Sequence, residues 1–376
     1  MDYRGKTPTK TEDGIFLVTA KNVKDGFIDY ETSKEYISEN AYEEVMRRGK
    51  PEIGDVLITT EAPCGNVAQV NKADIALAQR IIKYRGHIGV VDNTYLKHYL
   101  LSPEFQKILN AKSSGGTVQG IKGSILHQQK IIYPSYEEQK KIGQHMDSLD
   151  HLITLHQRKC DEVKSLKKYM LQKMFPQNEQ KVPEIRFEGF TEAWEQRKLG
   201  EVFKEYSEKN HTELSALTII QGGGTVKREE SDRNLMYDKS NLSNYKMVRK
   251  NDFIVHLRSF EGGLEKSLLD GIISPAYHTF HSDVADSRFY YPYFRSHEFI
   301  KHKLVPHVYG IRDGRSIDIA GMKTIEIPYT SIEEQRKIGD YLESLDHLIT
   351  LHQQKCEELK KIKKFMLQKN VCLGKR

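Results

Sequence analysis

Two short segments, residues 162–164 and 358–360, have the Glu-x-Lys spacing found in metal-dependent nucleases. Such an enzyme gathers acidic ligands and a lysine around a metal ion at the edge of a sheet. Here the middle residue, Val163 or Leu359, falls on the apolar face of a long helical pattern. The pattern therefore favours a solvated helix face with neighbouring charges over a nuclease centre.

A histidine and a cysteine four residues apart occur twice, as His156 with Cys160 and as His352 with Cys356. Two helices crossing at these positions could supply a Cys2His2 set of zinc ligands. However, all four residues lie within an apolar helix face, where cysteine packs as a small hydrophobic residue and histidine can fix the register of pairing. We therefore predict no metal site.

The glycine-rich segments also lack the context of a catalytic motif. Neither Gly115-Gly116 nor the triple glycine at 222–224 is followed by Lys-Ser or Lys-Thr in the spacing of a phosphate-binding loop. The chain has no Asn-Pro-Pro-Tyr or Asp-Pro-Pro-Tyr segment of the kind used by amino-methyltransferases, and no G-x-G-x-x-G opens a helix. The sequence therefore predicts a chain without a catalytic centre of its own.

Polar loops are better candidates for a binding site. Loops that mix Gly, Ser, Thr, Gln and basic residues allow close backbone approach and offer donors to phosphates and base edges. An ordinary surface loop remains the alternative for each of them. The candidate DNA-contacting residues are Ser113, Ser114, Thr117, Gln119, Lys122, Lys227, Arg228, Tyr309, Arg312 and Arg315.

The elements that must position these loops include one segment that the chain contains twice. Residues Glu137–Met174 are repeated, with few changes, as Glu333–Asn370. The stretch Ser148–Gln157 recurs unchanged as Ser344–Gln353, at an offset of 344 − 148 = 196. The tracts before the two copies, 131–134 and 325–328, end in proline, which suits a chain that leaves a strand and enters a helix.

Both copies have the spacing of a helix that pairs with another helix. Apolar residues recur every seven positions with a second column between them, which is a heptad-like seam. About 38 residues at roughly 1.5 Å each make a rod on the order of 55 Å long. Leu152, Leu155 and Leu166 widen the apolar stripe, so the helix can contact more than one partner. The predicted helix-pairing residues are Ile142, Leu149, Ile153, Val163, Met170, Ile338, Leu345, Ile349, Leu359 and Met366.

Composition limits the class of protein. With 376 residues, 38% of them hydrophobic and 29% charged, the chain can form two or three domains with their own cores. It has no run of 18 apolar residues and no signal peptide, so we expect no membrane association. Four cysteines suggest no disulfide framework, and we expect a cytoplasmic protein. The net charge of +6 permits nucleic-acid binding without requiring it.

The order of segments is globule, helix, globule, helix. We predict a first domain over residues 1–135, a spacer helix and linker over 136–180, a second domain over 181–331 and a second spacer helix over 332–376. Within the first domain, Asn93–Ala111 is predicted to be helical, because its apolar residues fall roughly on one face. The two globules share a plan but little residue identity, whereas the helices are nearly identical, which indicates a fixed scaffold carrying two different recognition domains.

The whole pattern resembles the DNA-specificity (S) subunit of type I restriction–modification systems. The resemblance is carried by E-x-Q-x-K-I-x-x-x-[ML]-x-x-L-D at Glu137–Asp150 and Glu333–Asp346, and by the continuation LITLHQxK in each copy. The stretch Arg186–Gly200 looks like the family's opening of a target-recognition domain, and Tyr3–Pro8 looks like a similar opening. These features cover almost the entire chain.

The resemblance implies an α+β fold: two mixed α/β target-recognition domains, joined by two long helices that pack as an antiparallel coiled coil with a pseudo-two-fold repeat. Each domain would read one half of a bipartite, asymmetric site in double-stranded DNA, and the helices would fix the gap between the halves. Two adenine-N6 methyltransferase subunits and a motor–nuclease subunit would be the partners. S-adenosylmethionine, magnesium and ATP would be bound by those subunits, and this chain would bind no cofactor.

One departure from the family pattern concerns the first domain. The second globule is preceded by the Arg186–Gly200 stretch, and the first is not. We therefore expect that the first domain lacks its opening segment, roughly 20–30 residues of a full-length member. The alternative to a DNA-reading subunit is a truncated or silent specificity cassette that acts only as a helical scaffold for protein assembly.

Overall fold

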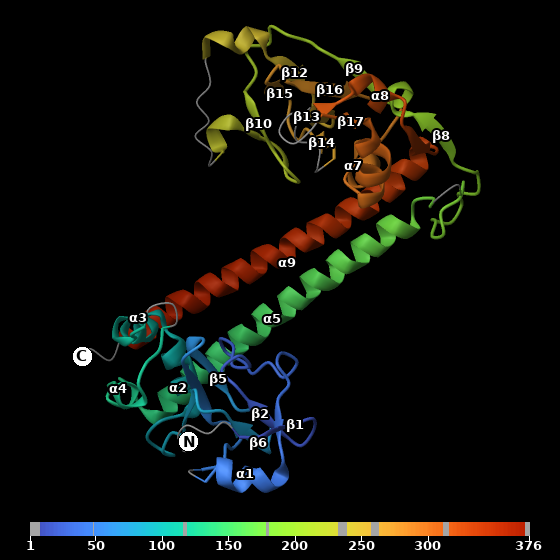
Figure 1. The fold of residues 1–376 in the computed structure, drawn as a ribbon. Coiled ribbons are helices and arrows are strands. Elements are labelled where there is room, and N and C mark those ends of the chain that lie inside the picture. The colour runs from blue at the N-terminus through green and yellow to red at the C-terminus, as the bar shows by residue number, and fades with distance from the viewer. Residues whose placement is uncertain are drawn as a thin grey trace. The chain divides into compact units, whose positions relative to one another are not determined.

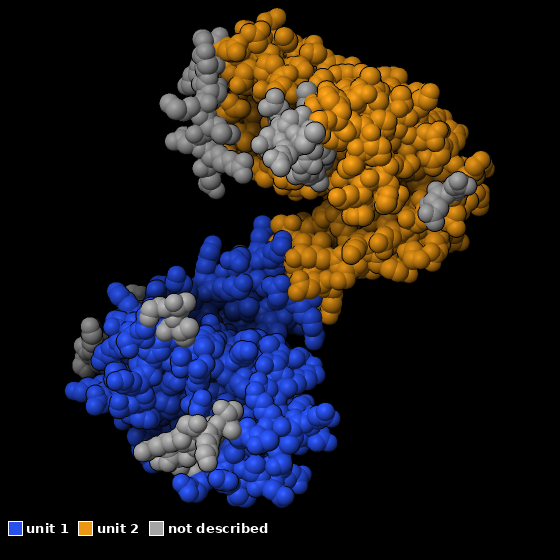
Figure 2. Space-filling view, in the orientation of Figure 1, with its two compact units in different colours: residues 1–158, 352–376 blue, residues 159–351 orange. Residues whose placement is uncertain are grey.

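The structure is a computed structural model of the chain, and it describes residues 8–47, 49–115, 119–177, 180–231, 239–256, 263–310 and 316–372. The chain divides into two compact units, shown in different colours in Figure 2. Unit 1 comprises residues 1–158 and 352–376, and unit 2 comprises residues 159–351. Among the described residues, no helix combines the length and the apolar character needed to cross a membrane.

Unit 1 contains two small sheets. The first has the strand order β1 (Lys10–Thr11), β3 (Tyr36–Ile37), β2 (Ile15–Val18) and β6 (Ile75–Leu77), with only the β2–β6 pair parallel. The second has the antiparallel order β5 (Cys64–Gln69), β4 (Val56–Thr60) and β7 (Ile81–Tyr84). Successive side chains of β4 point to opposite faces, so Leu57 enters one core cluster while Val56 and Ile58 enter another.

The helices of unit 1 cover these sheets. They are α1 (Glu39–Val45), α2 (Asn93–Leu101), α3 (Pro103–Lys112) and α4 (Gly123–His127). The prediction that Asn93–Ala111 is helical is confirmed, except that the structure divides this range into two helices, α2 and α3. Pro103 lacks a backbone N–H and takes the first position of α3, while Ser102 ends α2 and caps α3 through its side chain.

Unit 2 is built around the antiparallel sheet β14 (Glu265–Lys266), β13 (Phe253–His256), β16 (Tyr277–His281) and β9 (Lys204–Tyr206). Four antiparallel pairs surround it: β10 (Leu217–Ile220) with β11 (Gly224–Lys227), β12 (Lys246–Val248) with β15 (Gly271–Ile273), β17 (Val308–Tyr309) with β18 (Ser316–Ile317), and β19 (Glu326–Tyr329) with β8 (Glu195–Lys198). Its short helices are α6 (Leu199–Val202), α7 (Ser287–Phe294), α8 (Ile319–Lys323), a π-helical turn Phe299–Leu304, and the 3-10 turns Arg228–Glu230, Lys239–Asn244 and Val305–His307.

Aromatic side chains dominate the core of unit 2. Trp194, Phe289, Tyr290, Phe294 and Phe299 are each at most 1% exposed. Large rings bury much apolar area at low entropic cost and pack edge to face, as the rings of Phe289 and Tyr290 do at 88°. This core fixes α7 and the π-helical turn against the long helices.

The two repeated segments form the long helices α5 (Tyr136–Lys173) and α9 (Ile332–Cys372), which Figure 1 traces. Each helix contributes to both units. Within unit 1, Asp150 pairs with Lys363 and His156 with His352, so residue numbers rise along α5 as they fall along α9. Within unit 2, Cys160 lies beside Ile349 and Lys167 pairs with Asp346 in the same sense. The helices therefore pack antiparallel within each unit, and the expected α+β architecture with paired long helices is confirmed.

Candidate nucleic-acid interface and helix pair

The first predicted loop lies beside the turn that joins β4 to β5. Ser114 and Gly120 exchange two backbone hydrogen bonds, of 2.9 and 3.0 Å. The backbone N–H of Ile121 then donates to the carbonyl of Thr60 at the end of β4 (2.9 Å). These bonds hold Ser114, Gly120 and Ile121 together beside the end of β4.

Ser113 differs from its neighbours in this loop. Its hydroxyl donates to the carbonyl of Leu109 (2.8 Å) and lies 3.5 Å from the sulfur of Cys64, so it caps α3 and faces the domain. Thr117 lies outside the described residues. The predicted contacts that are exposed in unit 1 are Ser114, Gln119 and Lys122.

The second set of predicted contacts follows the β10–β11 hairpin of unit 2. Lys227 ends β11 opposite Leu217, and its exposed ammonium lies 3.9 Å from the carboxylate of Glu230. The guanidinium of Arg228 lies over the ring of Tyr245, 5.8 Å from its centroid. A cation held over an aromatic face is attracted by the ring, so the direction of this guanidinium is fixed.

The third set lies between β17 and β18. Tyr309 is 60% exposed and pairs with Ser316 across this hairpin. Arg312 and Arg315, which come between the two strands in sequence, lie outside the described residues.

A buried carboxylate that sequence reasoning missed anchors the β10–β11 hairpin. Glu265 accepts hydrogen bonds from the backbone N–H of Gly222 (2.7 Å) and from the Tyr291 hydroxyl (2.9 Å), and it pairs with Arg295. It therefore ties the turn of the hairpin to α7. No spacing in the sequence marks Glu265, because its partners come from two other segments, the hairpin turn and the end of α7.

The helix seam of unit 1 is formed by the first half of α5 and the end of α9. Met146, Leu149, Leu359 and Leu367 are buried against one another. Three half-buried residues pack around them: Ile142, Ile153 and Met366. An ion pair between Lys363 and Asp150 (2.5 Å) flanks this seam.

Unit 2 uses the same seam positions differently. Ile338 is buried and Met170 packs at the edge of the large aromatic core, so here the seam continues into the recognition domain. Leu345 is buried, whereas Val163 and Ile349 are half buried. The equivalent ion pair joins Lys167 to Asp346 at 2.6 Å.

The histidines and cysteines of the repeat do not form a joint ligand set. Nδ1 of His156 and Nδ1 of His352 share a hydrogen bond of 3.0 Å, which requires one ring to donate and the other to accept. The thiol of Cys160 faces the carbonyl of Ile349 at 3.9 Å, and that of Cys356 faces the carbonyl of Ile153 at 3.5 Å. The histidines thus contact their own repeat equivalents and mark the register of pairing.

A buried glutamine near the start of each long helix binds the adjacent recognition domain. Gln139 accepts from the backbone N–H of Asp92 (2.9 Å) and donates to the carbonyl of Val90 (2.9 Å). Gln335 accepts from the backbone N–H of Asp286 in the same way (3.0 Å). Both glutamines are fully buried. Their identity in the two copies was the available sequence signal, and sequence reasoning did not use it.

A glycine one turn later allows close approach of the helices. A Cβ at Gly143 would lie 3.0 Å from the backbone nitrogen of Tyr95, and one at Gly339 would lie 3.1 Å from that of Phe289. Such distances are tighter than most Cβ contacts, so a side chain here would require the neighbouring backbone to shift by a few tenths of an ångström. The segment Gln-x-x-x-Gly therefore attaches α2 to α5 and α7 to α9 by one common geometry.

Unit 1 adds a charged cluster at this junction. Asp147 accepts from Nε2 of His98 (2.7 Å) and pairs with Lys97, and both partners belong to α2. Burial alone would raise the pKa of Asp147, but the hydrogen bonds from His98 and Lys97 outweigh it and lower this pKa to about 2. Asp150 lies close enough to complete a His–Asp–Asp group, but Lys363 pairs with its carboxylate. Ammonium groups therefore take the positions that a cation would need.

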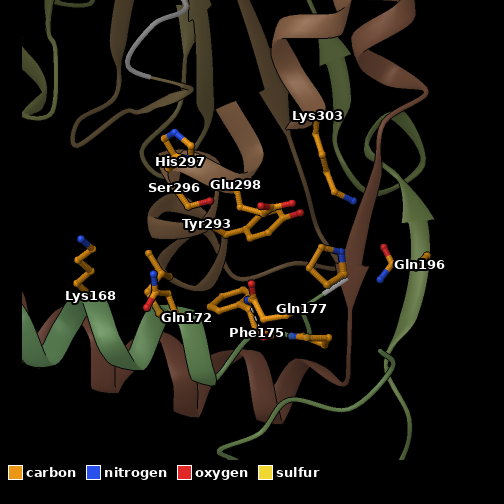
Figure 3. A pocket seen from close by; sticks show the side chains of 13 residues that line it. Lys168, Gln172, Phe175, Gln177, Gln196, Tyr293, Ser296, His297, Glu298 and Lys303 are labelled. Atoms are coloured by element: carbon orange, nitrogen blue, oxygen red, sulfur yellow. Dashed lines mark hydrogen bonds between the residues drawn. The ribbon is translucent and has the colours of Figure 1, made fainter. Parts of the chain in front are cut away.

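A cavity of about 240 Å³ in unit 2 lies where the end of α5 meets the segment after α7 (Figure 3). Lys168 and Gln172 line it from α5 and Phe175 from the segment directly after α5, while Tyr293 lines it from α7 and His297 from the segment after α7. Among the described residues, no hydrogen bond joins two titratable side chains of this cavity. It therefore presents mixed polar side chains and no assembled acid–base pair.

Comparison with known proteins decides the family. The model of the type I restriction modification DNA specificity domain matches residues 11–165 and again residues 191–361. The chain belongs to this type I restriction–modification specificity family. It is the specificity subunit of such a system: a non-catalytic component that recognises a DNA target, in a family whose cofactors typically belong to other subunits.

Relatives agree over nearly the whole chain. The type I restriction enzyme MjaVIII specificity subunit of Methanocaldococcus jannaschii is 25% identical over 90% of this chain and 84% of its own length. The MjaIX specificity subunit of the same organism is 25% identical over 89% of this chain and 80% of its own length. A crystal structure of a type I restriction–modification system S subunit from M. genitalium has the same fold, with a TM-score of 0.60, 15% identity, and coverage of 98% of this chain and 91% of that one.

Proposed function

We propose that this specificity subunit reads a bipartite, asymmetric site in double-stranded DNA, with one recognition domain for each half. The observation that carries the proposal is the contrast between the repeated helices and the domains they hold. Gln139 and Gln335 attach the two domains through the same bonds, while the loops of those domains differ in sequence. One scaffold thus holds two different reading surfaces.

The exposed polar and basic residues of the loops are the proposed DNA contacts. Lys122 in unit 1 and Lys227 in unit 2 would neutralise phosphates, because both ammonium groups are exposed. Arg228, held over Tyr245, and the exposed Tyr309 are suited to contacts with base edges or sugars. Arg312 and Arg315 remain predicted contacts from the sequence.

An exposed apolar stripe on the long helices supports docking of partner subunits. It lies outside the pairing seam and recurs at equivalent positions of the repeat: Leu152 and Leu348, Leu166 and Ile362, Tyr169 and Phe365. Each of these side chains is at least 39% exposed. Exposed apolar side chains that recur at equivalent positions of both helices suit a contact with two copies of one partner.

We infer that the two partners are adenine-N6 methyltransferase subunits, which bring S-adenosylmethionine, and that a motor–nuclease subunit with magnesium and ATP joins them for restriction. The test is co-expression with the cognate methyltransferase, followed by mapping of N6-methyladenine across a genome. A single motif with two defined halves is the expected result. A complex that assembles and leaves no methylated motif would contradict DNA reading.

Variants separate docking from reading. The double variant Tyr169→Ser with Phe365→Ser should weaken methyltransferase binding, because the docked subunit would no longer bury these two rings. The fold should persist, because both rings are exposed in this chain. Lys122→Ala and Lys227→Ala should weaken DNA binding about equally for all sequences, whereas Arg228→Ala should relax one half of the motif, with the complex intact in each case. Lys164→Ala, which changes an exposed lysine of the helix, is the matched control and should leave both properties unchanged.

A further inference from the structure

The β10–β11 hairpin of unit 2 has an exposed tip on a buried base. Leu217 and Thr225 are at most 2% exposed, whereas Ile220 is 43% exposed and Gln221 is exposed as well. The backbone N–H of Gly223 donates to the carbonyl of Ile220 (2.9 Å) and closes the turn. The hairpin therefore presents a short tip, with one amide side chain, from a base that is packed into the domain.

The position of this tip is fixed from below by Glu265. One carboxylate oxygen of Glu265 accepts from the backbone N–H of Gly222, and the other accepts from the hydroxyl of Tyr291. Arg295 pairs with the same carboxylate, so the buried charge is both paired and hydrogen bonded. A tip that is held in place before it binds loses little conformational freedom on binding.

Two glycines allow the hairpin to lie close to its supports. A Cβ at Gly222, where φ is +78°, would lie 2.9 Å from a guanidinium nitrogen of Arg295. A Cβ at Gly224, where φ is +71°, would lie 2.8 Å from the carbonyl oxygen of Lys266 and 2.8 Å from Cγ of Leu268. The hairpin thus lies directly against the segment that begins with β14, and a positive charge lies beside its tip.

The shape of this element suits the major groove of DNA. That groove, about 12 Å wide and about 8.5 Å deep, admits a two-stranded ribbon. Each strand of the hairpin has four residues, which at roughly 3.3 Å each span about 13 Å. Lys227 and Arg228 follow at the end away from the tip, and Arg295 lies beside the tip. Cations at both ends of a ribbon suit the phosphates that border the groove.

The side chains at the tip match one kind of base pair. The amide of Gln221 offers a donor and an acceptor, which fit N7 and N6 of adenine, whereas guanine presents two acceptors at its major-groove edge. Ile220 and Leu268 are 43% and 44% exposed, and they lie against Gly223 and Gly224 of the turn. Apolar side chains of this kind contact the C5-methyl group of thymine.

We propose that Gln221, flanked by Ile220 and Leu268, reads an A·T base pair in the major groove of the half-site bound by unit 2. Glu265 is a positioning residue that holds the tip for this contact. The inference rests on the proposed function and adds to it a reading residue and a base preference. Arg228, which follows the other end of β11, contacts a different position of the same half-site.

The test uses the full-length protein, co-expressed and purified with the cognate methyltransferase. The Gln221→Ala complex should assemble and should lose discrimination at one A·T pair by about tenfold or more, measured by competition between duplexes that differ only at that pair. The relaxed pair should lie in the half that Arg228→Ala relaxes, and the other half should stay unchanged. Gln196→Ala is the matched control, because Gln196 is an exposed glutamine on β8 of the same unit.

Two further measurements test the apolar contact and the positioning. Uracil in place of thymine removes only the C5-methyl group, so it should weaken binding of the unchanged complex by about twofold or more and leave an Ile220→Ser, Leu268→Ser complex unaffected. Tyr291→Phe keeps the ring and removes one donor to Glu265. It should lower discrimination at the same pair without changing non-specific DNA affinity or the circular dichroism spectrum, and unchanged discrimination would overturn the positioning role.

The outcomes separate this inference from the proposed function. A complex of the unchanged protein that leaves no methylated motif would overturn both. A defined motif that Gln221→Ala leaves unaltered, a relaxed position that holds a G·C pair, or relaxation in the half that Arg228→Ala spares would overturn this inference alone. Failure of the Gln221→Ala complex to assemble would also overturn it, because the tip would then contact a protein partner.

Discussion

Glu138 and Glu334 occupy the same position of the repeat, yet they lie in opposite environments. Glu334 is fully buried and holds Arg186 and the indole of Trp194, whereas Glu138 is exposed. Their neighbours Gln139 and Gln335, one residue along, are buried alike and make equivalent bonds. Identical helix sequence thus fixes which side chain points toward the domain, and the segment packed on it decides whether a charge is buried.

The largest expected effect comes from the seam, which both units require. Leu149→Asp should cost more than about 3 kcal/mol in the free energy of unfolding, because it removes buried apolar contacts and places an unpaired charge in the seam. Leu345→Asp should cost a similar amount. Urea unfolding followed by circular dichroism measures both, and Leu152→Asp, at an exposed position, is the control expected within about 0.5 kcal/mol.

The next effect should separate the two units. Glu334→Gln should cost about 3 kcal/mol, because Arg186 would remain buried without its carboxylate. Glu138→Gln should change the free energy of unfolding by less than about 0.5 kcal/mol. Equal changes in the free energy of unfolding for the two substitutions, measured by urea unfolding, would mean that Glu138 is covered. That result would contradict the difference in burial between Glu138 and Glu334.

A smaller effect should be shared by the units. Gln139→Ala and Gln335→Ala should each cost about 1–3 kcal/mol in the free energy of unfolding, because each leaves a partly buried backbone N–H, of Asp92 or Asp286, without its acceptor. Hydrogen exchange at residues 90–95 and 284–289 checks this directly. Faster exchange in only one of the two segments would show that the attachment geometry is not common to both.

The smallest expected effects concern how the free energy of unfolding depends on pH, and this dependence has opposite signs in the two units. In unit 2, burial opposes protonation of His281, but hydrogen bonds with Asp252 and Asp283 raise its pKa above the ordinary 6.5. Its stabilising contribution is complete below pH 6.5 and is lost as the pH rises through the raised pKa. In unit 1, the pKa of Asp147 is lowered to about 2, so its contribution is complete above the ordinary 3.8 and is lost as the pH falls toward 2.

Unfolding followed at a series of pH values tests both signs. The fluorescence of Trp194, the single tryptophan of the chain, reports on unit 2, where it is buried. In the His281→Asn variant, the stability of unit 2 measured by this fluorescence should no longer fall as the pH rises through the pKa of His281. Asp147→Asn should remove the acid-side loss seen by hydrogen exchange of α2, and a loss that persists in the variant would assign it to other carboxylates.

Several features could be predicted because they depend on local spacing. The long helices were expected at Glu137–Met174 and Glu333–Asn370, and they span Tyr136–Lys173 and Ile332–Cys372. A seven-residue apolar repeat specifies a helix and its buried face without knowledge of the partner. The break at Pro103 was also readable, since proline favours the first turn of a helix, but the apolar spacing on both sides concealed it.

Other features depended on segments far apart in the chain. Glu265 could not be recognised as the anchor of the β10–β11 hairpin, because Gly222, Tyr291 and Arg295 meet it only after folding. Ser113 reads as an exposed polar loop residue, yet its hydroxyl caps α3. Polar residues have several possible partners of similar energy, so tertiary packing decides which of them is used.

The sequence by itself determined the repeat, the two long helices, the absence of a recognisable catalytic motif and the family resemblance, because each is written in the identity and spacing of neighbouring residues. Tertiary structure alone decided that His156 meets His352, that Gln139 and Gln335 attach the domains, and that Glu334 is buried while Glu138 is exposed. The physical reason is that burial and hydrogen bonding belong to pairs of segments, and one segment's sequence does not state what packs against it.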